Sequence, residues 1–250
     1  MKAMILAAGL GTRLRPLTND RPKALVTVAG RTMLELALSR LRSFGVREVI
    51  VNAHHHADMI VDYLNAHDNF GMRIEVSREE VLLDTGGGLK KAASFFLEDS
   101  GSLREPFILH NVDVIANIDL GRMIRFHSES AALATLAVQD RATSRYLLFD
   151  EHGQLCGRRT GRDGEAELVR SAPEFQALAF CGIHVLSPRI FAKLEEEGAF
   201  SIIAAYMRLA AQGERIVAYR ADEYYWRDLG RPEDLIQAAQ DLSSGKYTVT

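Results

Sequence analysis

Residues 4–23, which read MILAAGLGTRLRPLTNDRPK, constrain the fold of this chain more than any other stretch. The first five are apolar and lead into Gly9-Leu10-Gly11, a pattern typical of a buried strand that enters a tight turn. Two glycines let the backbone approach a ligand closely, and the N–H groups of such a turn suit phosphate oxygens. Arg13 and Lys23 add two positive charges nearby. We therefore predict a strand followed by a cradle for a triphosphate.

Several glycine motifs compete to explain this loop. A dinucleotide-binding fingerprint requires glycine at positions 9, 11 and 14, but position 14 is Leu. A Walker loop requires Gly-Lys-Ser/Thr, whereas Gly11 is followed by Thr12-Arg13. A third pattern, G-x-G-T-R-[LM]-x-P-x-T-x-x-x-P-K, is matched at Gly9, Gly11, Thr12, Arg13, Leu14, Pro16, Thr18, Pro22 and Lys23. A plain glycine turn would not account for matches at nine positions, so we favour the third pattern over it.

Bulk composition limits the classes of protein to consider. A chain of 250 residues suits one α/β domain, and its net charge of −3 argues against a nucleic-acid-binding surface. Cys156 and Cys181 lack metal-ligand spacing and suggest a reducing compartment. No apolar run approaches the length needed to span a membrane. We expect a cytoplasmic protein with no nucleic-acid or membrane partner.

Hydrophobic periodicity along the chain predicts alternating strands and helices, and hence an α/β fold. Strands are expected at 4–8, 46–51, 72–76, 106–109, 131–138, 177–185 and 215–219, with a hairpin at 146–156. Helices are expected after a capping box at Thr32 and Glu35, and at 57–64, 89–97, 188–194, 202–211 and from Pro232. The polar, glycine-rich stretch 157–167 is expected to be a mobile loop.

Three further stretches are candidates for a site. Thr85-Gly86-Gly87-Gly88 opens a predicted helix and is either a flexible loop or a backbone surface for a base or ribose. Asp113 follows a predicted central strand, where open α/β sheets bind ligands, and its carboxylate suits Mg²⁺. His54-His55-His56 looks like a metal site, but neighbours in sequence cannot share one face, so we predict a helix entry there.

With these motifs the chain resembles the sugar-1-phosphate nucleotidyltransferases along residues 4–239. The glycine loop, a T-G-G-[GA] element at 85–88, Asn111-Val112-Asp113 in place of the family's N-G-D, and Trp226-Arg227-Asp228-Leu229-Gly230 carry the likeness. It is most similar to N-acetylmuramate-1-phosphate uridylyltransferases and to mannose- and heptose-1-phosphate guanylyltransferases. The resemblance implies a Rossmann-like mixed, mostly parallel sheet with helices on both faces, a small β insertion near 145–180 and no C-terminal β-helix.

The resemblance also implies a reaction and a set of site residues. A sugar 1-phosphate attacks the α-phosphorus of an NTP in line, giving an NDP-sugar and pyrophosphate, and its own charge makes a general base unnecessary. The implied sites are Arg13 and Lys23 for catalysis, Asp113 and Asp228 for Mg²⁺, Ala8, Gly9, Gly11, Thr12, Gly86 and Gly87 for the NTP, and Asn111, Gly182 and Arg158 for the acceptor. Residues 1–140 would mainly bind the NTP and 141–250 the acceptor, within a single domain.

Several matters stay open at this point. Many relatives carry Glu-Lys where this chain has Gly157-Arg158-Arg159, and Val112 replaces a glycine, so the acceptor is not fixed. The glycine-rich element at 85–88 favours UTP, and the sequence is compatible with a homo-oligomer. A catalytically silent regulatory subunit is one alternative, although all four charged positions are present. A cytidylyltransferase for phosphocholine is another, with Tyr224, Tyr225 and Trp226 as candidates for an aromatic cage.

Overall fold

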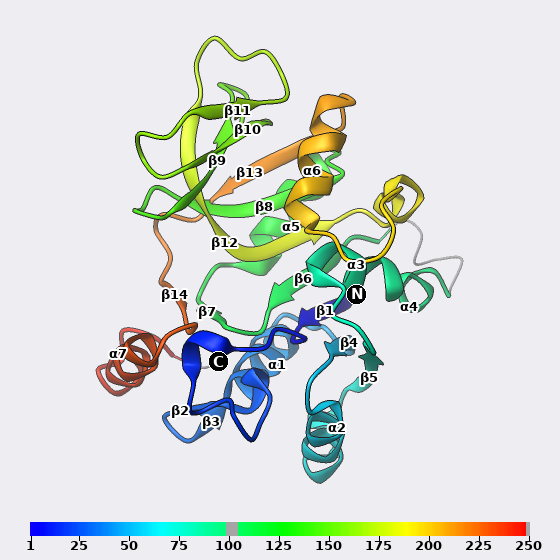
Figure 1. Cartoon of the computed structure of the whole chain (residues 1–250), viewed down its shortest axis with the longest axis vertical. Helices are drawn as coiled ribbons and strands as arrows, with labels where there is room; N and C mark the ends of the chain where they lie inside the picture. The colour runs from blue at the N-terminus through cyan, green and yellow to red at the C-terminus, as the bar shows by residue number, and fades with distance from the viewer. Residues whose placement is uncertain (99–104, 249–250) are drawn as a thin grey trace.

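A mixed β-sheet runs through the computed structural model, which describes residues 1–98 and 105–248 (Figure 1). Four neighbouring strands are parallel: β5 (Arg73–Arg78), β4 (Glu48–Ala53), β1 (Lys2–Leu6) and β6 (Phe107–Asn111). The long strand β12 (Gln176–Leu186) pairs antiparallel with β6 and also with β8 (Ala134–Gln139), which carries β13 (Ile216–Arg220) in parallel. The predicted α/β fold with a mixed sheet is confirmed, and the sheet is partly parallel: within the described residues, parallel pairing occurs in these two groups alone.

The predicted β insertion near 145–180 forms one end of the main sheet. Strands β9 (Arg145–Phe149), β10 (Leu155–Thr160) and β11 (Ala166–Leu168) continue the main sheet beyond β12, at the top of Figure 1. Two short ladders lie outside this sheet, β2 (Thr27–Val28) with β3 (Arg31–Thr32), and β7 (Val114–Ala116) with β14 (Trp226–Asp228).

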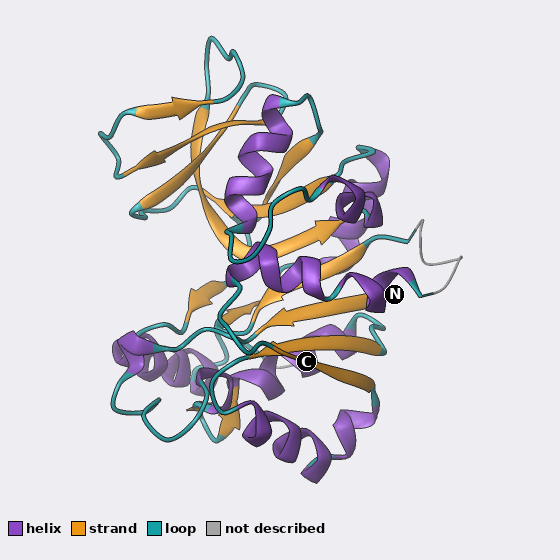
Figure 2. Cartoon of the chain, turned by 45° about the vertical axis from the view of Figure 1, so that its right-hand side comes forward, coloured by secondary structure: helices purple, strands orange, loops and turns teal. Residues whose placement is uncertain are grey.

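Helices cover both faces of the sheet, as predicted (Figure 2). Side chains alternate along β1, so Ala3 and Ile5 enter one core and Met4 the other. The first core is covered by α1 (Met33–Ser43), α2 (Ala57–Ala66), α5 (Leu120–Glu129) and α7 (Pro232–Ser243). The second is covered by α3 (Asp84–Lys91), α4 (Ala93–Leu97), α6 (Ile202–Ala211) and the 3₁₀ helix η4 (Pro188–Lys193).

Local signals fixed several helix ends correctly. The hydroxyl of Thr32 accepts a hydrogen bond of 3.0 Å from the backbone N–H of Glu35, which confirms the N-terminal cap of α1. Helix α2 begins at Ala57 directly after His56, which confirms the predicted helix entry at the histidines. In the part of the chain that the structure describes, no helix is long and apolar enough to cross a membrane.

Two predicted segments are wrong in part. Helix α3 begins at Asp84 and contains the three glycines, and a break at Ala92 separates it from α4, whereas one helix over 89–97 was expected. The predicted loop over 157–167 is confined to residues 161–165, because β10 continues to Thr160 and pairs with β11, which begins at Ala166. At the first place Gly86 packs on the distant Phe200, and at the second β10 pairs with β9 on one side and with β11 on the other.

Three buried histidines make the fold sensitive to acid. Burial lowers the pKa of His110 and His127 to about 4 and that of His184 to about 3, from an ordinary value of 6.5. The folded protein keeps these rings neutral at pH values where the unfolded chain protonates them. The unfolded state therefore binds more protons, and stability that is fully present above pH 6.5 is lost as the pH falls toward 4.

We expect His127→Asn to weaken this pH dependence. The Nδ1 of His127 lies 2.9 Å from the hydroxyl oxygen of Thr135, and asparagine keeps a hydrogen-bonding group there. Between about pH 7 and pH 5, wild type should lose roughly 2 kcal/mol more unfolding free energy than the variant, as measured by urea unfolding. His152→Asn is the control because that side chain is 73% exposed. Equal pH dependence in wild type and His127→Asn would contradict the assignment.

Candidate active site

The candidate site lies at the carboxyl edge of the parallel strands. Leu6, the last residue of β1, pairs with Asn52 of β4 on one side and with Asn111 of β6 on the other. The segments that leave these three strands therefore start side by side. Open α/β sheets bind ligands at this edge.

The glycine loop after β1 folds back on Lys23. Gly11 has a left-handed φ of 62°, and a Cβ there would lie 2.9 Å from Thr18 Cγ2 and 3.0 Å from Lys23 Cβ. Thr18 also donates a hydrogen bond of 2.9 Å from its hydroxyl to the Gly11 carbonyl. Gly11 is required here because only glycine tolerates both the backbone angle and the contact. The loop thus holds the stem of Lys23 against its own glycine.

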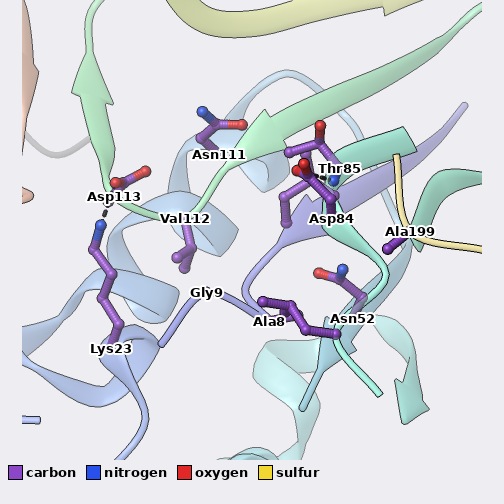
Figure 3. Close-up of a pocket in the computed structure, with 12 residues that line it drawn as sticks. Ala8, Gly9, Lys23, Asn52, Asp84, Thr85, Asn111, Val112, Asp113 and Ala199 are labelled. Carbon is purple, nitrogen blue, oxygen red and sulfur yellow. Dashed lines mark hydrogen bonds and ion pairs between the residues drawn. The ribbon is translucent and has the colours of Figure 1, made fainter. Parts of the chain in front are cut away.

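The two predicted metal ligands meet through the short β7–β14 ladder. Asp228 is opposite Val114, the residue after Asp113, and the N–H of Leu229 donates a 2.7 Å hydrogen bond to the Asp113 carbonyl. The ammonium of Lys23 forms an ion pair with Asp113 (Figure 3).

Arg13 completes the cluster beside Gly230. A Cβ on Gly230 would lie 2.5 Å from Arg13 Nη2 and 2.5 Å from Asp228 Oδ1. The fold therefore brings together four charged residues that are far apart in sequence: Arg13, Lys23, Asp113 and Asp228.

Charge repulsion shapes this cluster. Burial and the negative charge of Asp113 raise the pKa of Asp228. The N–H of Gly230, which donates a 2.7 Å hydrogen bond to Asp228 Oδ1, and the charges of Lys23 and Arg13 act in the opposite direction. Two carboxylates this close favour a bound cation. In residues 1–98 and 105–248, no three His, Cys, Asp or Glu side chains gather as a metal site, so a metal here would take its other ligands from a substrate or water.

Two pockets meet at this cluster. The first, which we call the loop pocket, has a volume of about 370 Å³ and is lined by residues that include Ala8, Gly9, Lys23, Asp84 and Thr85 (Figure 3). The second, the arginine pocket, has a volume of about 610 Å³ and is lined by residues that include Arg13, Arg145, Arg158, Arg159 and Asp228. Asn111 and Asp113 line both. Such volumes are in the range of small-molecule sites, roughly 300 to 1,000 Å³.

The remaining predicted residues lie around these pockets without lining them. Gly86 and Gly87 donate backbone hydrogen bonds to the Phe200 carbonyl at 2.8 and 3.3 Å, so their close packing is against residues 198–200. Gly182 lies in β12, where a Cβ would be 2.9 Å from Asn111 Nδ2. Thr12 is exposed at the start of the 3₁₀ helix Thr12–Leu14.

Sequence reasoning missed a buried polar pair that supports the loop pocket. Asn52 accepts a 2.7 Å hydrogen bond from the N–H of Ala7 and donates one of 2.7 Å to Glu79, whose other carboxylate oxygen accepts from the N–H of Leu83. The pair joins the glycine loop to the start of α3. A polar Asn at the end of an apolar strand was the available signal, but its distant partner was not visible locally.

The aromatic residues at 224–226 do not form a cage. Trp226 donates from its indole Nε1 to the Cys181 carbonyl at 2.7 Å, and the Arg141 guanidinium lies over its ring. Tyr225 stacks on Tyr247 and donates to Asp241. The ring faces of Trp226 and Tyr225 that a quaternary ammonium group would contact are therefore occupied by other side chains of the protein.

Known proteins resemble this chain over nearly all of its length. Residues 2–245 match the family model described as "Nucleotidyl transferase". The N-acetylmuramate alpha-1-phosphate uridylyltransferase of Caulobacter vibrioides is 36% identical, over 96% of this chain and 96% of that protein. The mannose-1-phosphate guanylyltransferase of Mycobacterium tuberculosis is 28% identical over 97% of this chain, which spans 65% of that longer protein.

Solved structures share the fold. HddC of Yersinia pseudotuberculosis, complexed with GMP-PN, superposes with a TM-score of 0.74 at 22% identity, over 96% of this chain and 98% of that one. The family model covers nearly all of the sequence, and the Caulobacter protein matches most of both lengths. The chain therefore belongs to the nucleotidyl transferase family, and its sequence groups it with the sugar-1-phosphate nucleotidyltransferases that make NDP-sugars.

Proposed function

We propose that this protein transfers a uridylyl group from UTP to N-acetylmuramate 1-phosphate, with Mg²⁺ as its metal. The observation that carries this choice is the 36% identity, over 96% of both chains, to the Caulobacter enzyme of that name.

The two pockets suggest how the substrates divide. The loop pocket is lined mainly by residues before position 114 and would take the NTP. The arginine pocket is lined mainly by residues after position 142 and would take the acceptor. Asn111 and Asp113, which line both, would then lie where the two phosphates meet. This arrangement supports a division into an NTP-binding half, 1–140, and an acceptor-binding half, 141–250.

The chemistry requires the protein to bring two anions together. In our proposal a phosphate oxygen of the acceptor attacks the α-phosphorus of UTP, a new P–O bond forms, and the α–β phosphoanhydride bond breaks to release pyrophosphate. Arg13 would offset negative charge on the α-phosphate and on the departing pyrophosphate. Lys23 would offset the negative charge on the phosphate oxygens in the transition state. The acceptor is already anionic, so its attack needs no general base.

Asp113 and Asp228 fit a divalent cation. They are close enough for the charge of Asp113 to raise the pKa of Asp228, and hard carboxylate oxygens suit Mg²⁺. When bound there, Mg²⁺ would neutralise phosphate charge between the two pockets.

A pyrophosphate-release assay with four NTPs and a panel of acceptors tests the proposed substrates. We expect the highest kcat/KM for UTP with N-acetylmuramate 1-phosphate, above N-acetylglucosamine 1-phosphate and mannose 1-phosphate. A preference for GTP and mannose 1-phosphate would make the protein a guanylyltransferase instead. A preference for CTP and phosphocholine would support the cytidylyltransferase alternative, and no turnover with any pair would support a regulatory subunit.

Arg158→Ala is expected to raise the KM for the acceptor severalfold and leave the KM for the NTP unchanged. Arg158 lines the arginine pocket but not the loop pocket, and its Nε pairs with Glu167 at 2.6 Å. Initial rates with each substrate varied in turn measure the two constants. An unchanged acceptor KM would remove Arg158 from the acceptor site.

Gly230→Ala is expected to lower kcat by roughly ten- to a hundredfold, because small displacements of reacting groups are costly. The new Cβ would push against both Arg13 and Asp228. The φ of Gly230 is not left-handed, so the backbone itself accepts alanine. The melting temperature should stay close to that of wild type. Full activity in this variant would show that the close contact between Gly230 and the two side chains is unimportant.

A further inference from the structure

Arg141 is a partly buried cation that belongs to neither pocket. It follows β8, and its guanidinium lies 3.7 Å from the centroid of the Trp226 ring. Its Nη2 donates a 2.8 Å hydrogen bond to the Phe180 carbonyl, while its buried Nε lacks a hydrogen-bond partner in residues 1–98 and 105–248. Burial lowers the pKa of Arg141. A buried charge with few partners is costly to keep, which points to a role for it.

Arg141 and Trp226 bind consecutive carbonyls of β12. Arg141 binds that of Phe180, and the indole of Trp226 binds that of Cys181 at 2.7 Å. The pairing of β12 with β8 shifts register between Phe180 and His184, so the sheet is irregular at this point. In place of regular strand pairing, the side chains of Arg141 and Trp226 hold the backbone just before Gly182. We call these two side chains and the two carbonyls that they bind the clamp.

The clamp connects three parts of the active site. Trp226 is two residues before Asp228 on β14, so fixing its ring fixes the strand that carries this carboxylate. Phe180 lines the arginine pocket, and Gly182 lies against the side chain of Asn111. The negative charge of Asp228 in turn opposes the effect of burial on the pKa of Arg141.

We propose that Arg141 is a positioning residue for nucleotidyl transfer: stacked on Trp226 and bonded to the Phe180 carbonyl, it holds β14 on β12 and so fixes Asp228 beside Asp113. This inference rests on the proposed role of Asp228 in binding Mg²⁺. Loss of the clamp frees β14 to shift and weakens metal binding at the carboxylate pair. It also loosens the wall of the arginine pocket at Phe180.

Arg141→Met tests the clamp because methionine keeps much of the aliphatic stem and removes the charge and the planar group. We expect the Mg²⁺ concentration for half-maximal activity to rise about tenfold, and the KM of the acceptor to rise more than that of the NTP. Arg141→Lys keeps the charge without the planar stack and should recover only part of the loss. Arg220→Met is the matched control, since that arginine is exposed and pairs with Asp222 at 2.7 Å.

Trp226 provides a second readout, independent of activity, because it is the chain's single tryptophan. We expect Arg141→Met to shift its emission to longer wavelength while the circular dichroism stays unchanged. We also expect the Mg²⁺-dependent change of this emission, measured with UTP bound, to move to higher Mg²⁺ in the variant. If the emission shifts but the Mg²⁺ dependence of both signals matches wild type, the positioning role is wrong.

Asp228→Asn separates this inference from the function on which it rests. A normal Mg²⁺ requirement in Asp228→Asn would contradict the metal site itself. An impaired Asp228→Asn beside a wild-type Arg141→Met would contradict only the role of Arg141. If Arg141→Met does not fold, Arg141→Lys carries the same comparison.

Discussion

Replacing Arg13 with alanine is expected to lower kcat by at least about a hundredfold, as the removal of one transition-state charge contact commonly does. Arg13 lines the arginine pocket and lies beside Asp228 at Gly230. In the proposed reaction it offsets charge that grows on the α-phosphate and on pyrophosphate. Its effect should therefore appear in kcat more than in the KM of the NTP. Pyrophosphate release under saturating substrates measures it.

Two further variants sharpen this test. Lys at position 13 keeps the charge but not the planar fork of the guanidinium, so Arg13→Lys should recover only part of the activity. Arg21→Ala is the matched control in the same loop, because Arg21 is exposed and pairs with Asp20 at 3.1 Å. A wild-type kcat for Arg13→Ala would exclude a catalytic contact.

Asp113→Ala is expected to lower kcat by at least about a hundredfold and to remove the activation by Mg²⁺. Asp113 lines both pockets, pairs with Lys23, and meets Asp228 through the β7–β14 ladder. Its loss would leave one carboxylate for the metal and release the ammonium of Lys23. Rates measured across a Mg²⁺ titration give both effects.

The stability of this variant has to be measured alongside its activity. Lys23 and Asp113 have side chains only 11% and 17% exposed, so removing the acid leaves a largely buried ammonium without its partner. Asp113→Asn keeps the volume and serves as a second variant. Asp20→Asn, at an exposed carboxylate, is the control. Normal turnover with Mg²⁺ in either Asp113 variant would reject the metal assignment.

The local sequence determined much of this protein. The apolar run before Gly9-Leu10-Gly11 predicted a buried strand and a turn, and β1 ends at Leu6 just before them. Thr32 and Glu35 predicted the start of α1, and periodicity alone gave the limits of α6, Ile202–Ala211. These features depend on neighbours within a few residues, so short-range patterns are sufficient to reveal them.

Only the tertiary structure decided how the distant parts meet. Asp228 reaches Asp113 because β14 pairs with β7, and nothing near either residue specifies that register. Within α3, the glycines at 86–88 lie so close to Phe200, Gly198 and Asn52 that side chains at these positions would clash. The stack of Arg141 on Trp226 likewise joins the end of β8 to β14. Such contacts are set by packing and strand register over long sequence separations, which local propensity does not encode.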